Sequence, residues 1–246
     1  MNDYLQEIKL LVASEYGLVV EFGMVITPEI NALAQDFTRL LNSKKIVGII
    51  EIIPTYRSVM INFDPLCITR TDLTEFIRQT LSEIKPQDIK KLSPKIVHVP
   101  VCYGGVLGPD LEFVARHAGL SAKDVIEIHT SKPYLVYMLG FTPGFPYLGG
   151  MSDKIAVPRR EMQRVKIPRG SVGIGGSQTG FYPIESLGEW WLIGRTPVEA
   201  FNVKSLNPFL FSAGDYLHFV HITIDEYFNI RRAVEGGTYR AEVSSI

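Results

Sequence analysis

The stretch YLVYMLGFTPGFPYLGG, residues 134–150, shows how the second half of this 246-residue chain is built. A β-rich apolar run ends at Gly140, and a loop dense in glycine, proline and aromatic residues follows. Glycine opens backbone conformations that a Cβ forbids, and proline fixes φ and removes a donor, so the loop suits neither helix nor strand. It is either a stiff turn in a β domain or a binding-site rim. The candidate pocket residues in this loop are Phe141, Gly144, Phe145 and Tyr147.

Short apolar runs continue to alternate with glycine and proline from this loop to residue 224. That spacing predicts a closed or nearly closed β-barrel. A strand is expected at 95–103 and short helices at 108–120 and 121–131, the second opened by a capping box of Ser121 and Asp124. A terminal helix is expected at 225–236.

The first 91 residues have a different pattern, ββαββα. Strands are expected at 7–14, 17–23, 45–54 and 58–65. One helix follows Thr27 with Pro28 at its first position, and a second starts at Asp72 and stops before Pro86. The fold class is therefore α+β: a four-stranded sheet with two helices in an α/β sandwich domain at 1–91, then a barrel domain at 92–246. The polar, proline-bracketed segment 85–95 is the expected linker.

The composition of the chain limits the kinds of partner and the location that we expect for it. The formal net charge is −1, which gives no reason to expect nucleic acid or an anionic membrane. No apolar run approaches the roughly 18 residues of a membrane span, and the first residues do not resemble a signal peptide. The only cysteines, Cys67 and Cys102, are expected to be reduced thiols, and a cytoplasmic location is predicted.

GSVGIGGSQTG, residues 170–180, is the second glycine-rich stretch. It lacks the spacing of a dinucleotide fingerprint and the Lys-Ser or Lys-Thr end of a P-loop. Two interpretations stay open. The glycines allow strands of a tight hairpin to cross closely, or their backbone amides face a ligand together with nearby side chains. The residues of the second interpretation are Gly173, Gly175, Gly176, Gln178 and Thr179.

Five arginines lie near these two stretches: Arg159, Arg160, Arg164, Arg169 and Arg195. Guanidinium groups bind carboxylate or phosphate bidentately, so arginines that converged on one cavity would select an anionic ligand. Most arginines are simply solvated, and Arg195, between a strand-like run and a turn, is the best placed. Tyr147 and Tyr182 could add hydroxyl groups to the same site.

No catalytic group can be assigned from the pattern. His218 and His221 are three apart, which places them on opposite faces of a strand and disfavours a shared metal ion. No metal site is predicted. Cys102 lies at a strand end and is expected to be a small buried side chain rather than a nucleophile.

Several ordered runs carry a resemblance to a known family: YGGVLGPDLEFVARHAGLS, VYMLGFTPGFPYLGG, VPRR, GSVGIGGSQTGFYP and WWLIGRTPVEAF, with IIPTYRSVMINFDP in the first half. They resemble the KipI family, also called allophanate hydrolase subunit 1 or the B subunit of 5-oxoprolinase. The resemblance covers nearly the whole chain. It implies an α/β domain followed by a cyclophilin-like β-barrel. Arg169 stands where a small residue is common in the family, and would narrow the pocket or add an anion contact.

The resemblance implies three activities. The first is membership of an ATP-dependent 5-oxoprolinase complex, which opens 5-oxo-L-proline to L-glutamate. Its partners would belong to the KipA family (the C subunit of 5-oxoprolinase) and the LamB/YcsF family (the A subunit of 5-oxoprolinase), and ATP would bind to this chain or elsewhere in the complex. The second is inhibition of a sensor histidine kinase, and the third is part of allophanate hydrolase. The first is preferred, because it is the more general role of stand-alone members, and an anionic substrate suits the arginines.

Overall fold

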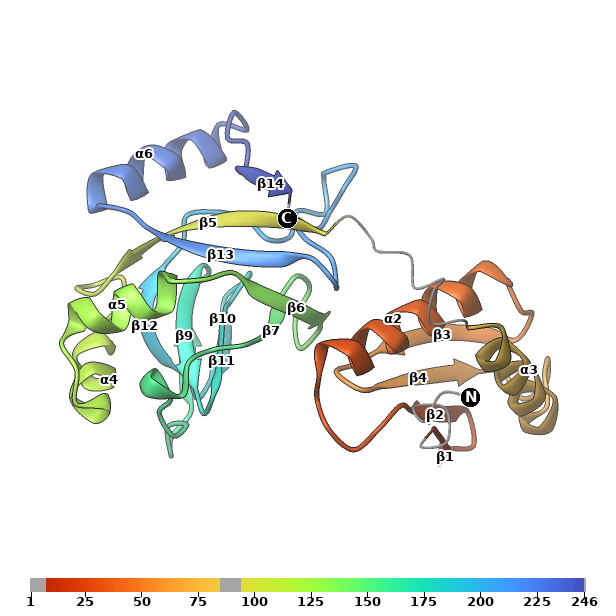
Figure 1. The fold of residues 1–246 in the computed structure, drawn as a ribbon. Helices are drawn as coiled ribbons and strands as arrows, with labels where there is room; N and C mark the ends of the chain where they lie inside the picture. Colours follow the sequence, from red (N-terminus) through yellow and green to blue (C-terminus); the bar gives the residue numbers. More distant parts are fainter. Residues whose placement is uncertain (1–7, 85–93, 246) are drawn as a thin grey trace. The chain divides into compact units, whose positions relative to one another are not determined.

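The computed structural model describes residues 8–84 and 94–245, and Figure 1 shows their fold. The chain divides into two compact units, residues 1–92 and 93–246. The predicted domain boundary after residue 91 and most of the predicted linker lie in 85–93, outside the described residues, so both stay predictions.

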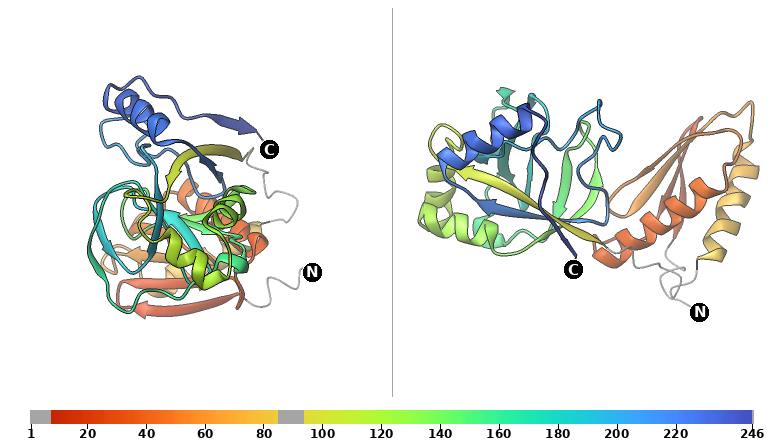
Figure 2. Two further views of the ribbon diagram at one scale, coloured as in Figure 1. Left: turned by 90° about the vertical axis from the view of Figure 1, so that its left-hand side faces the viewer. Right: turned by 90° about the horizontal axis from the view of Figure 1, so that it is seen from above.

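The N-terminal unit is an antiparallel sheet in the order β1-β2-β4-β3, with two helices on one face (Figure 2). The predicted ββαββα order is confirmed. Thr27 accepts a hydrogen bond from the amide of Ile30, and Pro28 opens the first helix as expected. The second helix begins at Arg70, because the hydroxyl of Thr69 accepts from the amide of Asp72 and so caps the helix two residues before the predicted start. The elements are β1 Lys9–Ser14, β2 Gly17–Glu21, α2 Pro28–Ser43, β3 Ile49–Pro54, β4 Ser58–Phe63 and α3 Arg70–Glu83.

The second unit is built around a sheet in the order β10-β9-β12-β5-β13-β6-β7, with β14 beside β5. The two end strands, β10 and β7, approach each other. A Cβ on Gly180 of β10 would lie 3.0 Å from the carbonyl oxygen of Pro146 in β7, so glycine permits this approach. The sheet is therefore a nearly closed barrel, and the α+β class with a cyclophilin-like barrel is confirmed. Its strands are β5 Lys95–Tyr103, β6 Tyr134–Leu139, β7 Pro146–Gly149, β9 Ser171–Gly175, β10 Gln178–Phe181, β12 Trp191–Arg195, β13 Tyr216–His221 and β14 Val243–Ser245.

Short helices and one small sheet surround the barrel. Figure 1 shows α4 and α5 stacked beside each other and α6 alongside β5 and β13. Gly119 ends α4 in the left-handed conformation (φ 67°), and Ser121 with Asp124 forms the predicted capping box of α5. These elements are α4 Leu111–Ala118, α5 Ala122–Thr130, the 3-10 helix η2 Asp153–Ile155, α6 Ile224–Glu235, and the paired strands β8 Arg164–Ile167 and β11 Ser186–Gly188.

The barrel interior is an apolar core to which alternate residues of each strand contribute. Val99 and Val101 of β5, Val172 and Ile174 of β9 and Phe181 of β10 belong to it. The residues between them therefore point to the outer face of the sheet. Within the described residues, no helix has both the length and the apolar character needed to cross a membrane.

Candidate functional site

The glycine-rich stretch 170–180 is the β9–β10 hairpin, as one of the two interpretations predicted. Its glycines make room for an aromatic ring. A Cβ on Gly175 would lie 2.3 Å from Cδ1 of Trp190, and a Cβ on Gly173 would lie 3.2 Å from Cβ of the same residue. On Gly180 it would lie 3.4 Å from the Trp190 ring. The Trp190 ring thus packs directly on the bare backbone of the hairpin's outer face.

The second interpretation, that glycine amides face a ligand, is corrected at Gly176. Its N–H donates to the carbonyl oxygen of Val157 at 2.7 Å, so that amide is already engaged within the chain. Gly173 lies between two antiparallel neighbours, opposite Gly180 in β10 and Leu192 in β12. The hairpin acts as a platform for side chains.

Thr179 is also corrected as a ligand contact, because its side chain is fully buried inside the barrel. Its hydroxyl donates to the carbonyl oxygen of Gly173 at 3.0 Å and lies 2.7 Å from Nε2 of His129. Since the only hydroxyl proton goes to Gly173, His129 donates from Nε2, and its Nδ1 accepts from the Tyr103 hydroxyl at 2.7 Å. Burial lowers the pKa of His129 to about 3, so the imidazole is neutral in this chain of hydrogen bonds.

Five aromatic side chains gather on the outer face and form what we call the aromatic layer: Phe141, Phe145, Tyr147, Tyr182 and Trp190. The Phe145 ring is at its centre, 5.3 to 5.6 Å from the centroids of the other four, at steep interplanar angles. Such edge-to-face contacts stabilise aromatic pairs beyond the area they bury. Phe145, Tyr182 and Trp190 are buried, whereas Phe141 is 60% exposed. The sequence-predicted pocket loop therefore supplies three of the five rings.

The loop that presents Phe141 is tight and strained. Phe141 has φ 62°, a left-handed conformation that bulky residues rarely adopt. The amide of Thr142 donates to Gly140 at 2.7 Å, and the amide of Phe145 donates to Thr142 at 3.0 Å, which closes two successive turns. Gly144 (φ 82°) packs so closely that a Cβ there would lie 2.9 Å from Cβ of Phe201. Backbone strain of this kind concentrates at functional sites.

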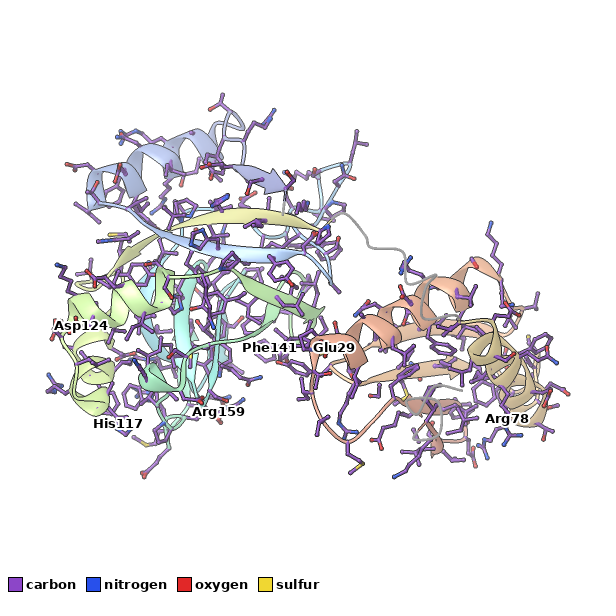
Figure 3. All side chains as sticks on the ribbon, viewed as in Figure 1. Glu29, Arg78, His117, Asp124, Phe141 and Arg159 are labelled. Carbon is purple, nitrogen blue, oxygen red and sulfur yellow. The ribbon has the colours of Figure 1, made fainter. Side chains whose placement is uncertain are left out.

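Arg159 supplies positive charge next to the layer. Its Nη2 donates to Oε1 of Gln178 at 3.2 Å. Its charge also acts on the two layer tyrosines. Burial raises the pKa of Tyr147, and raises that of Tyr182 to about 12, while the nearby guanidinium of Arg159 partly opposes both shifts. Figure 3 labels Phe141 and Arg159 on the barrel domain, together with His117 of α4 and Asp124 of α5.

The other candidate arginines do not converge with Arg159. Arg160 lies over the ring of Trp191, 4.9 Å from its centroid, a cation–π contact that holds it on the barrel. Arg195 pairs with Ser171 at the start of β9, whereas Gln178 follows the turn at the other end of this strand. The five arginines therefore do not converge on one cavity, which was the condition for them to select an anionic ligand together.

Two more arginines are neutralised by acids of the same chain. Nη2 of Arg164 contacts both carboxylate oxygens of Asp110 at 2.6 and 2.7 Å, and Arg169 contacts Glu199 at 2.7 Å. The expected anion contact of Arg169 is thus made within the chain.

Among the described residues, no group of three or more His, Cys, Asp or Glu side chains is arranged to hold a metal ion. Cys102 is a buried free thiol, and burial raises its pKa, which disfavours the reactive thiolate. His218 lies 3.3 Å from His98, Nδ1 to Nδ1, across paired strands β13 and β5. The two histidines are 120 residues apart in the sequence, so their spacing could not predict the contact. The register of β13 against β5 places them opposite each other.

The fold is that of a described class of protein, as comparison with known proteins shows. The chain belongs to the family of the carboxyltransferase domain, subdomain C and D, whose model matches residues 8–211. Among curated proteins, it is 41% identical to the 5-oxoprolinase B subunit of Bacillus subtilis over 220 residues, which cover 86% of this chain and 91% of that protein. It is 37% identical to the 5-oxoprolinase B subunit of Haemophilus influenzae over 75% of this chain and 84% of the relative.

The chain is also similar to several proteins of known structure. A conserved uncharacterized protein from Pyrococcus horikoshii is 40% identical, with a TM-score of 0.54 over 89% of this chain and all of that one. The structure of TTHA0988 is 32% identical with a TM-score of 0.74, and this chain spans only 39% of its length. The urea amidolyase of K. lactis has a TM-score of 0.81 at 22% identity, with this chain covering 16% of it, so that likeness concerns the fold alone.

Proposed function

We propose that this chain is the B subunit of a 5-oxoprolinase complex, which opens 5-oxo-L-proline to L-glutamate with hydrolysis of ATP. The observation that carries the proposal is the 41% identity to a protein named as a 5-oxoprolinase B subunit along 91% of its length. The matched proteins named urea amidolyase are only 23 and 24% identical, and this chain covers 14% of each. Family membership alone would also accommodate allophanate hydrolase or a kinase inhibitor, but the similarity along nearly the full length of the first relative favours the oxoprolinase.

The aromatic layer suits part of this chemistry. Exposed Phe141 offers an apolar face to a flat lactam ring, and the Arg159 guanidinium offers charge to a phosphorylated oxygen. The Gln178 amide, held by Arg159, can hydrogen-bond an amide group. We assign binding and orientation of substrate to these residues.

Catalytic groups are assigned to partner chains in this proposal. In the described part of this chain the one fully buried histidine, His129, is neutral and faces the core, and the Cys102 thiol is buried. Neither is placed to act as an exposed base or nucleophile. The proposed partners are a KipA-family protein and a LamB/YcsF-family protein, with ATP bound within the complex, and the proposed location is the cytoplasm.

The test is glutamate release from 5-oxo-L-proline and ATP by the chain with both partner proteins, omitting each component in turn. The expected result is turnover only when all three proteins and ATP are present. Arg159→Gln should raise KM, while Arg116→Gln, the same charge change on the exposed face of α4, should not. A full mixture of folded proteins that releases no glutamate would reject the proposal.

A further inference from the structure

Ser171 and Arg195 form a cross-strand pair on the outer face of the barrel. They are direct neighbours in the antiparallel pairing of β9 with β12. Val172 beside Ser171 and Val101 beside Cys102 point into the barrel core. Because successive side chains of a strand alternate between faces, Ser171 points outward, and so do its cross-strand partner Arg195 and the next partner Cys102 in β5.

Both members of this pair have polar atoms that are buried and without a partner. Ser171 is 0% exposed, and its hydroxyl has no hydrogen-bond partner. Arg195 is half-buried as a residue, and its Nε atom is buried without a partner. Side-chain polar atoms in protein interiors are rarely left unpaired, and each unpaired group calls for an explanation. Because Ser171 and Arg195 are cross-strand neighbours, two such residues lie side by side here.

Arg195 differs from other arginines with an unpaired Nε in the hydrogen bonding of the rest of its guanidinium group. Nε is also unpaired in Arg164 and Arg70, but Nη2 of each makes hydrogen bonds, to Asp110 and to backbone carbonyls of Ser14 and Glu15. Across the residues described in the structure, Arg195 has neither an acidic partner nor an acceptor. Its charge is thus uncompensated by contact within the chain.

The backbone at Gly170 leaves room for the aliphatic part of the Arg195 side chain. Gly170 (φ 80°) has no Cβ, and one placed there would lie 3.3 Å from Cγ of Arg195 and 2.2 Å from the carbonyl oxygen of Thr196. Glycine therefore lets the arginine stem pass over the turn that precedes β9. The neighbouring Arg169 is held by Glu199, whereas Arg195 has no such partner among the residues that the structure describes and keeps its donors beside Ser171.

We propose that Ser171 and Arg195 form a carboxylate-binding site. Nε–H and an Nη–H of one guanidinium match the two oxygens of a carboxylate, and the Ser171 hydroxyl adds a third donor. An acceptor-only group satisfies all of these atoms at once. The identification of this carboxylate as that of 5-oxo-L-proline rests on the proposed function, whereas the site itself rests on the two unpaired side chains.

The experiment is titration calorimetry of the full chain with three probes: 5-oxo-L-proline, acetate, and 2-pyrrolidinone, which has the lactam ring without the carboxylate. We expect the two carboxylates to bind and 2-pyrrolidinone not to bind through this site. Arg195→Gln should weaken carboxylate binding roughly tenfold to hundredfold, as loss of a charged hydrogen-bond partner does. Arg195→Lys should weaken it less, and Arg116→Gln should leave it unchanged.

Ser171→Ala separates a binding role from a folding role. Since the hydroxyl has no partner in the chain, the melting temperature without ligand should not fall, but the rise on adding carboxylate should shrink. Arg195-dependent binding of acetate without binding of 5-oxo-L-proline would support the site and reject the oxoprolinase substrate. Absence of carboxylate binding in the unmodified chain, or binding unaffected by Arg195→Gln, would overturn the site. Glutamate release by the complex that is unaffected by Arg195→Gln would overturn the assignment to 5-oxo-L-proline alone.

Discussion

Buried polar side chains are hydrogen-bonded on the inner face of the β9–β10 hairpin but lack partners on its outer face. On the inner face, Thr179, His129 and Tyr103 form a closed chain in which each hydrogen-bonding atom has a partner. On the outer face, an aromatic ring lies on glycine backbone, and Ser171 and Arg195 keep unpaired donors. A satisfied buried network specifies a fold, whereas unpaired donors leave capacity for a ligand. We therefore assign folding to the inner face of this sheet and ligand binding to its outer face.

The largest effect should come from breaking the outer platform at Gly175. Gly175→Ala puts a Cβ 2.3 Å from Cδ1 of Trp190, so the buried indole must move. We expect the free energy of unfolding to fall by about 3 kcal/mol, measured by denaturant titration. Gly176→Ala is the matched control: its φ is 64° but a Cβ would meet nothing within 4 Å, so only the left-handed strain, about 1 kcal/mol, remains. Equal losses for both variants would contradict the packing explanation.

The inner network should respond to pH through His129. Because burial lowers its folded pKa from 6.5 to about 3, the unfolded chain binds the proton first as pH falls. The stability that neutral His129 contributes is present above pH 6.5 and is lost as pH decreases below it. From pH 6.5 to 4.5 this loss should be about 2 kcal/mol.

His129→Gln isolates that contribution, because all other titrating groups are kept. The free energy of unfolding of the unmodified chain should fall more steeply with decreasing pH than that of the variant, by close to one proton per molecule in the middle of this range. Parallel pH dependences would mean that His129 is not held neutral in the fold.

The two faces should also differ in the free energy of unfolding that is lost when a buried hydroxyl group is removed. Thr179→Val is close in shape and leaves Nε2–H of His129 without an acceptor in the core, so it should cost about 1.5 kcal/mol in denaturant unfolding. Ser171→Ala removes a hydroxyl that has no partner and should cost close to nothing. A large cost for Ser171→Ala would show that its hydroxyl serves folding, and the division between the faces would not hold.

Local patterns predicted the elements of the fold but not the contacts between them. Thr27, Ser121 and Gly119 mark helix ends through hydrogen bonds and conformations set within a few residues, so the sequence shows them. The contact of Trp190 with Gly175 and the pairing of Ser171 with Arg195 depend on the register of β9 and β12, which only the closed barrel sets.

One signal for the inner network was present in the sequence. Thr179 and Phe181 are two apart in a strand and so share a face, and the large apolar Phe181 indicates that this face is the core. His129, 50 residues away, could not be matched to Thr179 by spacing, because a helix from another part of the chain brings it there. The sequence could not show which arginines are neutralised for the same reason: Asp110 and Glu199, which neutralise Arg164 and Arg169, are distant in sequence.

The smallest effect concerns the strain at Phe141, the exposed edge of the outer face. Phe141→Gly and Phe141→Ala both remove the ring and its contact with Phe145, but only glycine adopts φ 62° without steric cost. The glycine variant should therefore be about 1 kcal/mol more stable than the alanine variant in denaturant unfolding. If the ring binds substrate, both variants should lose glutamate release by the complex to the same extent. A glycine variant no more stable than the alanine variant would mean that the loop relaxes at no cost, and that the strain is not imposed by the two turns around Phe141.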